Sequence, residues 1–325
     1  MLLRTITLAI VMTASVTVSD AQTSSEAWPT RPLTLIVPNP AGSSNDIIAR
    51  IVGRDLSTRL GQPVIIENRP GADGTIGVRQ VVRAAPDGYT FSFGSSTAYA
   101  GVPYLYLNPP YDPLKDLAPI SIVGRSPYVF VVSPSLEAKS VADVVALAKA
   151  KPGHLNYSSI GEGSIAQLGM ADFEERMGIK LQHIPYKSTA QSIVDVSTGI
   201  IQMQLATVAP TVPLFEAQKV RVLGIAGKNR LSLFQGVPTM AEAGVPGYEH
   251  TFWVAMFAPA STPQPIVERV NREIRAGLAT AALRQAFNLQ GVETEHSGAE
   301  GLQHILQNDI MTYRSTASKA GVPRR

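Results

Sequence analysis

The chain contains no cysteine among its 325 residues. This absence excludes a disulfide framework, a cysteine-based metal site and a thiol nucleophile, and also a lipid anchor attached through cysteine. Charged residues are scarce, at 16% of the chain, and Lys and Arg cluster only at Arg324-Arg325. A nucleic-acid surface needs a basic patch or stripe, so we expect no nucleic-acid partner. The net charge of +3 is a small positive excess, which suits anionic small ligands.

Signatures of catalysis and of nucleotide binding are also missing. The sequence has neither a G-x-S-x-G nucleophile elbow nor a G-x-x-x-x-G-K-[ST] phosphate loop. The segment Gly161–Ala166 matches a dinucleotide fingerprint, but the next strand ends in His183-Ile184-Pro185-Tyr186, without the acid that would bind a ribose. No histidines fall at metal-ligand spacing. We therefore expect no metal, no cofactor and no enzymatic activity.

Only the first residues carry an extended apolar run. Arg4 supplies a positive charge, Ile6–Val18 are mainly apolar, and Ser19-Asp20-Ala21 is a plausible signal-peptidase site. Several hydroxyl side chains interrupt this run, which is too short to span a bilayer comfortably. These features favour a cleaved secretory signal over a membrane anchor. We expect residues 1–21 to be a signal peptide and the mature protein to be soluble and periplasmic.

Strand, loop and helix alternate along the rest of the chain. We expect strands at residues 33–37, 64–67, 89–93, 129–132, 155–158, 181–184, 203–206, 220–225 and 252–257, and helices at 45–60, up to about 85, 140–150, 165–177, 188–197, 265–280, 281–289 and 299–320. Repeated βα units predict parallel sheets covered by helices. Chain crossings near Ile122–Ser126 and Thr251–Val254 suggest two lobes with a cleft. The expected lobes are residues 28–124 plus 254–325, and residues 125–253.

Four of the expected strands end in small or hydroxyl-bearing residues. These strand ends are Pro40–Asp46, Gly94–Ala98, Ser158–Ser164 and Thr207. In doubly wound sheets such ends converge on the binding crevice, where helix N-terminal amides bind anions. We therefore predict that these segments meet a carboxylate ligand.

Two residues of the first loop have more specific expected roles. Asp46 lies in the first turn of a helix, where it either stabilises the helix dipole or shapes the loop and bonds a ligand donor. Gly42 is expected to exclude a side chain, because a Cβ would intrude where ligand or water meets the backbone.

Seven stretches of the chain, in this order and spacing, resemble the Bug family, the extracytoplasmic solute receptors of tripartite tricarboxylate transporters. The stretches are WPTRPLTLIVPNPAGSSND, LGQPVIIENRPGADGTIG, AAPDGYTF, LNYSSIGEGS, IPYKSTAQSIVD, VPTMAEAGVPGYE and FAPASTPQPIVERVN. The resemblance implies an α/β fold of the periplasmic-binding-protein, or Venus-flytrap, type. Each lobe would be a sheet flanked by helices, with a small carboxylate bound in the interlobe cleft. It also implies delivery to membrane permease subunits, and we expect a monomer.

The resemblance also implies which residues bind the ligand. They lie on the strand-end segments of both lobes: Asn39, Pro40, Ala41, Gly42, Ser43, Asp46, Ser95, Ser96, Thr97, Ser159, Gly163, Ser164, Tyr186 and Thr207. The chain departs from the family pattern at three places. Asn39 replaces the usual Phe of the first loop, Gln167 stands where His is frequent, and Ala206-Thr207 replace a common Asp-Asn pair.

Losing that acid removes a natural partner for a ligand amine. The departures therefore favour a dicarboxylate, aromatic ones included, over an amino acid. Two other functions remain open from sequence: a receptor that presents its ligand to a membrane signalling protein, and an exported enzyme on an α/β scaffold.

Overall fold

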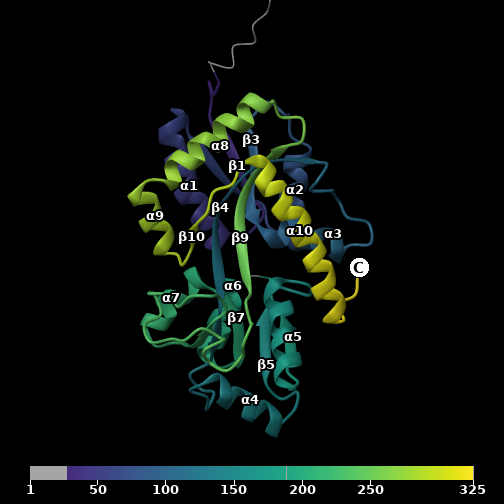
Figure 1. Cartoon of the computed structure of the whole chain (residues 1–325), viewed down its shortest axis with the longest axis vertical. Coiled ribbons are helices and arrows are strands. Elements are labelled where there is room, and N and C mark those ends of the chain that lie inside the picture. The colour runs from purple at the N-terminus through teal and green to yellow at the C-terminus, as the bar shows by residue number, and fades with distance from the viewer. Residues whose placement is uncertain (1–27, 188, 325) are drawn as a thin grey trace, which may run out of the picture.

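Two long strands connect the halves of the molecule (Figure 1): β4 (Leu117–Val132) and β9 (Thr251–Pro259). They pair antiparallel from Leu117 opposite Pro259 to Pro127 opposite Thr251. The structure is a computed structural model that describes residues 28–187 and 189–324. The expected signal peptide lies outside the described residues. The expected lobe boundaries fall opposite each other in this pairing, where Gly124 faces Val254 and Arg125 faces Trp253.

Lobe 1 is the upper half in Figure 1, and its sheet has the order β2-β1-β3-β9-β4, with β10 also paired to β4. β1 pairs in parallel with β2 and β3, whereas β3 runs antiparallel to β9. Its other strands are β1 (Leu33–Val37), β2 (Val64–Asn68), β3 (Thr90–Ser95) and β10 (Glu293–Thr294). Its helices are α1 (Ser44–Leu60), α2 (Thr75–Val82), α3 (Val102–Leu105), α8 (Gln264–Leu278), α9 (Ala281–Asn288) and α10 (Ala299–Lys319), with short turns η2 (Ala72–Gly74) and η3 (Thr97–Gly101).

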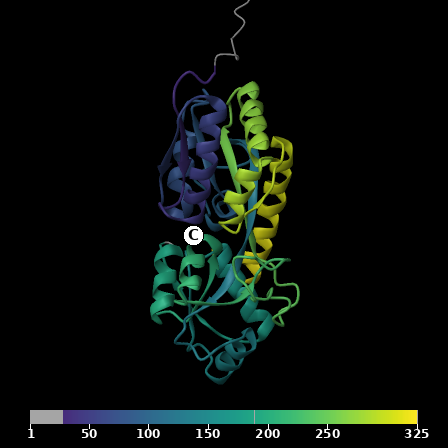
Figure 2. The same cartoon turned by 90° about the vertical axis from the view of Figure 1, so that its left-hand side faces the viewer.

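Lobe 2 is the lower half, and its sheet continues from β4 in the order β4-β7-β5-β6, with β8 also paired to β4. β5 is parallel to β6 and β7, whereas β4 is antiparallel to β7 and β8. Its strands are β5 (Asn156–Ser159), β6 (Gln182–Pro185), β7 (Met203–Thr207) and β8 (Arg221–Ile225). Its helices are α4 (Val141–Ala150), α5 (Ile165–Met177), α6 (Thr189–Thr198) and α7 (Val208–Glu216). Figure 2 shows the two lobes stacked along the long axis, with α10 extending from lobe 1 toward lobe 2.

Local residue chemistry defines several helix ends. Ser43 caps α1 by accepting the Asp46 amide, and Gly61 ends the helix in the left-handed region at φ 70°. α4 begins with a capping box between Ser140 and Asp143. Gly178 ends α5 in the left-handed region at φ 60°.

The structure corrects several sequence expectations about the strands. The sheet is mixed rather than parallel, because β4 and β9 run antiparallel to their neighbours. β4 is much longer than the expected strand at residues 129–132. Pro119 and Pro127 lie within it, and proline normally argues against a paired strand. Pairing with β9 tolerates irregularity there, since the register shifts between Pro119 and Ser121 and again between Ile122 and Gly124.

Helical segments also differ from expectation. Gly94–Ala98 is not a loop: Gly94 and Ser95 belong to β3, and the π-helical turn η3 follows almost at once. The helix expected to end near residue 85 ends at Val82. α7 was not predicted, and it forms despite Pro213 inside it.

Apolar side chains cover both faces of the sheet. One cluster runs through both lobes and includes Phe91, Phe130 and Phe173. A smaller cluster joins the lobes directly, because Leu105, Tyr313 and Ala317 of lobe 1 pack with Leu168 of lobe 2. Among residues 28–187 and 189–324, no helix is both long enough and apolar enough to span a bilayer.

The substitution Gly124→Val should destabilise the chain crossing. A Cβ at Gly124 would lie 2.6 Å from Val292 Cγ1 and 2.7 Å from the Glu293 carbonyl oxygen, so β10 would have to leave β4. We expect a loss of about 1–3 kcal/mol in unfolding free energy, measured by urea denaturation. Gly298→Ala is the control, since a Cβ there meets no atom within 4 Å. Equal midpoints for both variants would contradict this packing.

Candidate functional site

The first strand-end loop is held in place by close backbone packing around Pro38. A Cβ added to Gly77 would lie 2.9 Å from Pro38 Cα, and one added to Gly74 would lie 3.2 Å from Pro38 Cβ. On the other side, a Cβ at Gly94 would lie 3.1 Å from Pro38 Cγ. Three glycines from α2, η2 and β3 thus let the chain segments approach Pro38 closely. This packing fixes where the β1–α1 loop meets the cleft.

Asn45 links the first loop to the end of β3. Its side-chain amide donates to Asn39 Oδ1 at 2.7 Å and to Ser95 Oγ at 3.2 Å. The Asn45 Oδ1 and Ser44 Oγ atoms are buried and have no hydrogen-bond partner in the described part of the chain. Buried polar atoms of this kind are normally satisfied, so they mark a place that suits a polar ligand or water.

Asp46 lies behind the loop, where it is 3% exposed. Its carboxylate accepts hydrogen bonds from the Gly42 amide (2.9 Å), Arg50 Nε (3.1 Å) and Asn68 Nδ2 (3.0 Å). Burial alone would raise the pKa of Asp46, but these hydrogen bonds and the Arg50 charge outweigh it and hold the pKa below its usual range. Of the two roles considered for Asp46, the contacts favour shaping the loop.

The backbone at Gly42 adds a second requirement for glycine. A Cβ there would meet no protein atom within 4 Å, but the backbone lies at φ 77°, which other residues adopt at a cost. Its amide donates to Asp46. The predicted clash of a Cβ with ligand or water stays a prediction.

The lobe 2 loop between β5 and α5 is closed by its own hydrogen bonds. Ser159 Oγ accepts the Gly161 amide at 3.1 Å and lies 2.7 Å from His183 Nε2. Ser164 caps α5 and donates to the Gly161 carbonyl at 2.7 Å. Gln167, which stands at the family's frequent His position, accepts the Gly163 amide at 3.1 Å. The loop is thus preorganised by its own side chains.

Tyr186 follows β6 and presents a neutral hydroxyl. It donates to Asp195 Oδ2 at 2.5 Å. Burial, together with the Asp195 carboxylate, raises the pKa of Tyr186 to about 12. The hydroxyl is therefore already bonded within lobe 2.

A cavity of about 600 Å³ lies between these loops, lined by lobe 1 and lobe 2 together. A smaller cavity of about 50 Å³ shares Asn39, Ser95, Thr97 and Ile160 with it, so the two form one cleft. The predicted site residues that line this cleft are Asn39, Pro40, Ser43, Ser95, Thr97, Ser164, Tyr186 and Thr207.

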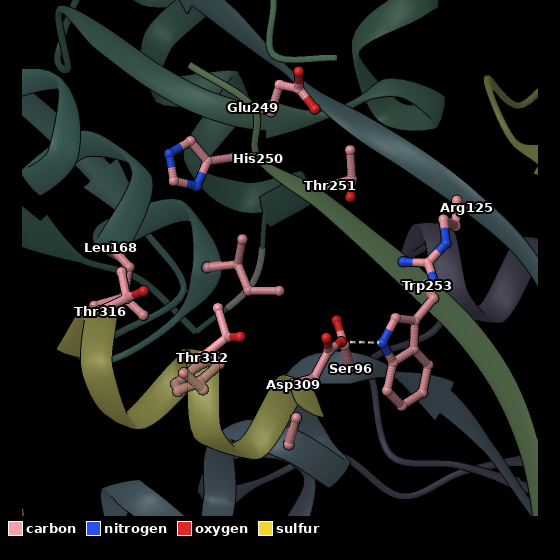
Figure 3. Close-up of a pocket in the computed structure, with 13 residues that line it drawn as sticks. Ser96, Arg125, Leu168, Glu249, His250, Thr251, Trp253, Asp309, Thr312 and Thr316 are labelled. Atoms are coloured by element: carbon pink, nitrogen blue, oxygen red, sulfur yellow. Dashed lines mark hydrogen bonds between the residues drawn. The ribbon is translucent and has the colours of Figure 1, made fainter. Parts of the chain in front are cut away.

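The remaining predicted residues line neither cavity of the cleft. Ala41 and Gly42 are exposed residues of the first loop, Asp46 is buried and accepts the Gly42 amide, and Ser159 is buried within the second loop. Gly163 lies against Leu105 of lobe 1. Ser96, which directly precedes η3, lines a separate cavity (Figure 3).

One group of residues that line the cleft was not predicted from the sequence. Pro70–Gly74, at the carboxyl end of β2, line the larger cavity, as do Leu105 and Lys187. The glycines at positions 71 and 74, which follow a predicted strand, were the sequence signal that could have placed Pro70–Gly74 at the cleft. Nothing in the local sequence placed Leu105 beside the cleft.

Four helices begin at the cleft. The residues that precede α1, α2, α5 and α7 all line one of its cavities, namely Ser43, Gly74, Ser164 and Thr207. Each helix N-terminus carries roughly half a positive charge and free amides. In the larger cavity, the charged lining residues are Lys187 and Asp73, and Asp73 accepts a hydrogen bond from Tyr106 at 3.2 Å. The arrangement suits anionic oxygens.

Known proteins resemble this chain in sequence and in fold. The family model described as the tripartite tricarboxylate transporter family receptor matches residues 48–321. The chain belongs to this family. It is 34% identical to the protein BugT of Bordetella pertussis over 303 residues, covering 93% of each chain. The family and its structural neighbours are solute-binding receptors rather than enzymes.

Two solved receptors illustrate the structural likeness. Rpa4515 of R. palustris, solved with adipate, is 32% identical with a TM-score of 0.88, covering 92% of this chain and 100% of that one. MatC of Rhodopseudomonas palustris, solved with malate, is 26% identical with a TM-score of 0.82, covering 89% and 100%. This chain therefore has the predicted periplasmic-binding-protein fold.

The contact between Gly163 and Leu105 should control how closely the lobes approach. A Cβ at Gly163 would lie 1.9 Å from Leu105 Cδ2, and the backbone there has φ 74°. We expect Gly163→Ala to weaken ligand binding about tenfold, and Leu105→Ala added to it to restore part of that loss. Calorimetry on the single and double variants measures both effects. If Leu105→Ala restores nothing, backbone strain rather than the interlobe contact sets the loss.

Proposed function

We propose that this receptor is exported to the periplasm and binds a small dicarboxylate with an apolar spacer between its lobes. It would deliver that ligand, as a monomer, to the membrane subunits of a tripartite tricarboxylate transporter. The observation that carries the proposal is the larger cavity of the cleft. Its lining combines hydrogen-bonding groups, a large share of apolar side chains and a single lysine.

The first carboxylate would sit where the helix N-termini meet. Asn39, Ser95 and Thr97 line both cavities there, and the lining residues of the smaller cavity carry no formal charge. Hydroxyl and amide donors bind a carboxylate through charge-assisted hydrogen bonds. The unpartnered Ser44 hydroxyl offers one more donor at the same end.

The apolar part of the lining favours an apolar spacer. It consists of proline, alanine and aliphatic side chains: Pro38, Pro40, Pro70, Ala72, Ala98, Leu105 and Ile160. Apolar surface of this kind gains from covering methylene or aromatic carbon, at about 25 cal/mol per Å² removed from water. The proposed spacer is consistent with the adipate bound by Rpa4515.

The second carboxylate would approach Lys187. This lysine follows β6 and lines the cavity together with Tyr186. Asp73 would repel a carboxylate placed next to it, so the ligand's second charge should lie toward lobe 2. Thr207, standing where the family commonly has an acidic pair, lines the smaller cavity without charge and offers no counter-ion for a ligand amine.

Calorimetry with a ligand panel tests the ligand class. We expect adipate or terephthalate to bind more tightly than hexanoate, glutamate or aspartate. Lys187→Met should weaken diacid binding about tenfold and leave hexanoate unchanged, because only the diacid has a second charge. Lys180→Met is the matched control, since Lys180 is an exposed lysine just before the start of β6 and Lys187 follows its end. Tight binding of glutamate, with no measurable binding of adipate or terephthalate, would exclude the proposed ligand class and leave the receptor assignment intact.

Uptake separates transport from the alternative roles. A strain lacking this chain should lose most uptake of the bound diacid, and the full-length gene should restore it. A variant without residues 1–21 should not restore uptake if export depends on them. Normal uptake together with a lost transcriptional response to the diacid would instead support the signalling receptor. Consumption of the diacid by the purified protein would support the exported enzyme.

A further inference from the structure

A second cavity of about 250 Å³ lies at the chain crossing, apart from the ligand cleft (Figure 3). Lobe 1 contributes Ser96 and one face of α10, lobe 2 contributes Leu168 and His250, and β9 contributes Trp253. The α10 residues that line it are Asp309, Thr312, Tyr313 and Thr316, which recur at helical spacing. Figure 3 shows Asp309, Thr312 and Thr316 along α10, facing His250 and Thr251 across the space.

Two buried hydroxyl groups in this cavity have no partner. Ser96 is 4% exposed and Tyr313 is 7% exposed. Neither Ser96 Oγ nor the Tyr313 hydroxyl has a hydrogen-bond partner within residues 28–187 and 189–324. A buried hydroxyl without a hydrogen-bond partner is unfavourable, so two of them lining one cavity favour an occupant with hydrogen-bonding groups.

The charges around the cavity favour a cation. Asp309 Oδ2 accepts the Trp253 indole N–H at 2.5 Å, and the described residues offer Asp309 no ion pair. Arg125 lines the same cavity, but its guanidinium bonds to Glu295 at 2.5 Å. His250 likewise bonds to Asp172 at 3.0 Å. Both basic groups thus form ion pairs with acids outside the lining. Within residues 28–187 and 189–324, Asp309 and Glu249 form no ion pair, although the Arg125 charge still acts on Asp309 at longer range.

Burial agrees with this charge assignment. It raises the pKa of Asp309, and the Trp253 hydrogen bond and the Arg125 charge together offset only part of that rise. A bound cation would stabilise the ionised carboxylate and so counteract the effect of burial.

We propose that the cavity at the chain crossing binds a small primary ammonium ion, with Asp309 as its counter-ion and with Ser96 and Tyr313 as further hydrogen-bond partners. An ammonium group carries three N–H donors, which matches one carboxylate oxygen and two hydroxyl oxygens. The volume is below the roughly 300–1,000 Å³ of pockets for drug-sized ligands, so the cation has few non-hydrogen atoms. This site does not depend on the ligand proposed for the cleft.

The indole N–H resonances of the two tryptophans provide the test. Trp253 donates to Asp309, whereas Trp28 Nε1 has no partner in the described part of the chain and serves as an internal control. The two signals are assigned with Trp28→Phe. Ethylammonium chloride is titrated into the ¹⁵N-labelled protein at neutral pH against sodium chloride of equal ionic strength. We expect a saturable shift of the Trp253 signal, with a dissociation constant of about 1 mM at best for so small a ligand, and no shift of the Trp28 signal.

Variants identify the groups that bind. Asp309→Asn keeps an acceptor for the indole but removes the charge, so it should abolish the saturable shift. Ser96→Ala and Tyr313→Phe should each weaken binding at least threefold, and 1-propanol, a neutral molecule of similar size, should not compete. No saturable Trp253 shift up to 50 mM (about fifty times that constant), or the same shift in Asp309→Asn or with 1-propanol, would overturn the proposal. A dispersed amide spectrum for each variant establishes that it is folded.

Discussion

The antiparallel pairing of β4 with β9 is the constraint on which the rest of the structure depends. The two strands run through both lobes, and their backbone hydrogen bonds continue across the boundary at Gly124 and Val254. A change in the angle between the lobes must therefore be absorbed by this ribbon and by its two register shifts. The strand-end loops of the two lobes face one another because this ribbon holds the sheets in line.

The cleft is formed mainly by strand-end loops and helix N-termini, and charged side chains make up only a small part of its lining. Four helix N-termini converge on it, and the acid nearest the first loop, Asp46, is used to hold that loop in shape. Side chains that could vary the chemistry, Tyr186 and Lys187, come from lobe 2. The site thus combines a general preference for anions with a smaller set of groups that select among them.

Local signals in the sequence were sufficient for elements whose ends carry their own chemistry. Ser43 and Gly61 bracket α1, and Ser164 and Gly178 bracket α5, so both helices could be placed closely. β4 could not, because Pro119 and Pro127 break the strand pattern and only pairing with β9 overrides them. Leu105 and Lys187 were missed as cleft residues for a related reason: their position depends on how the lobes approach, which no short segment encodes. The repeated βα units and the two chain crossings indicated two lobes, and the family resemblance identified the periplasmic-binding-protein type.

The packing of three glycines around Pro38 has a consequence for how receptors of this kind can diverge. Contacts of this closeness leave no room for larger side chains at Gly74, Gly77 or Gly94 without displacing the loop. The lobe 1 half of the cleft therefore has a fixed shape, because substitutions at these glycines would disturb the packing of the loop around Pro38. Lobe 2 contributes Lys187, an exposed residue after β6, where a substitution changes the surface offered to a solute without entering the core. New solute preferences should arise by altering one lobe while the other is inherited unchanged.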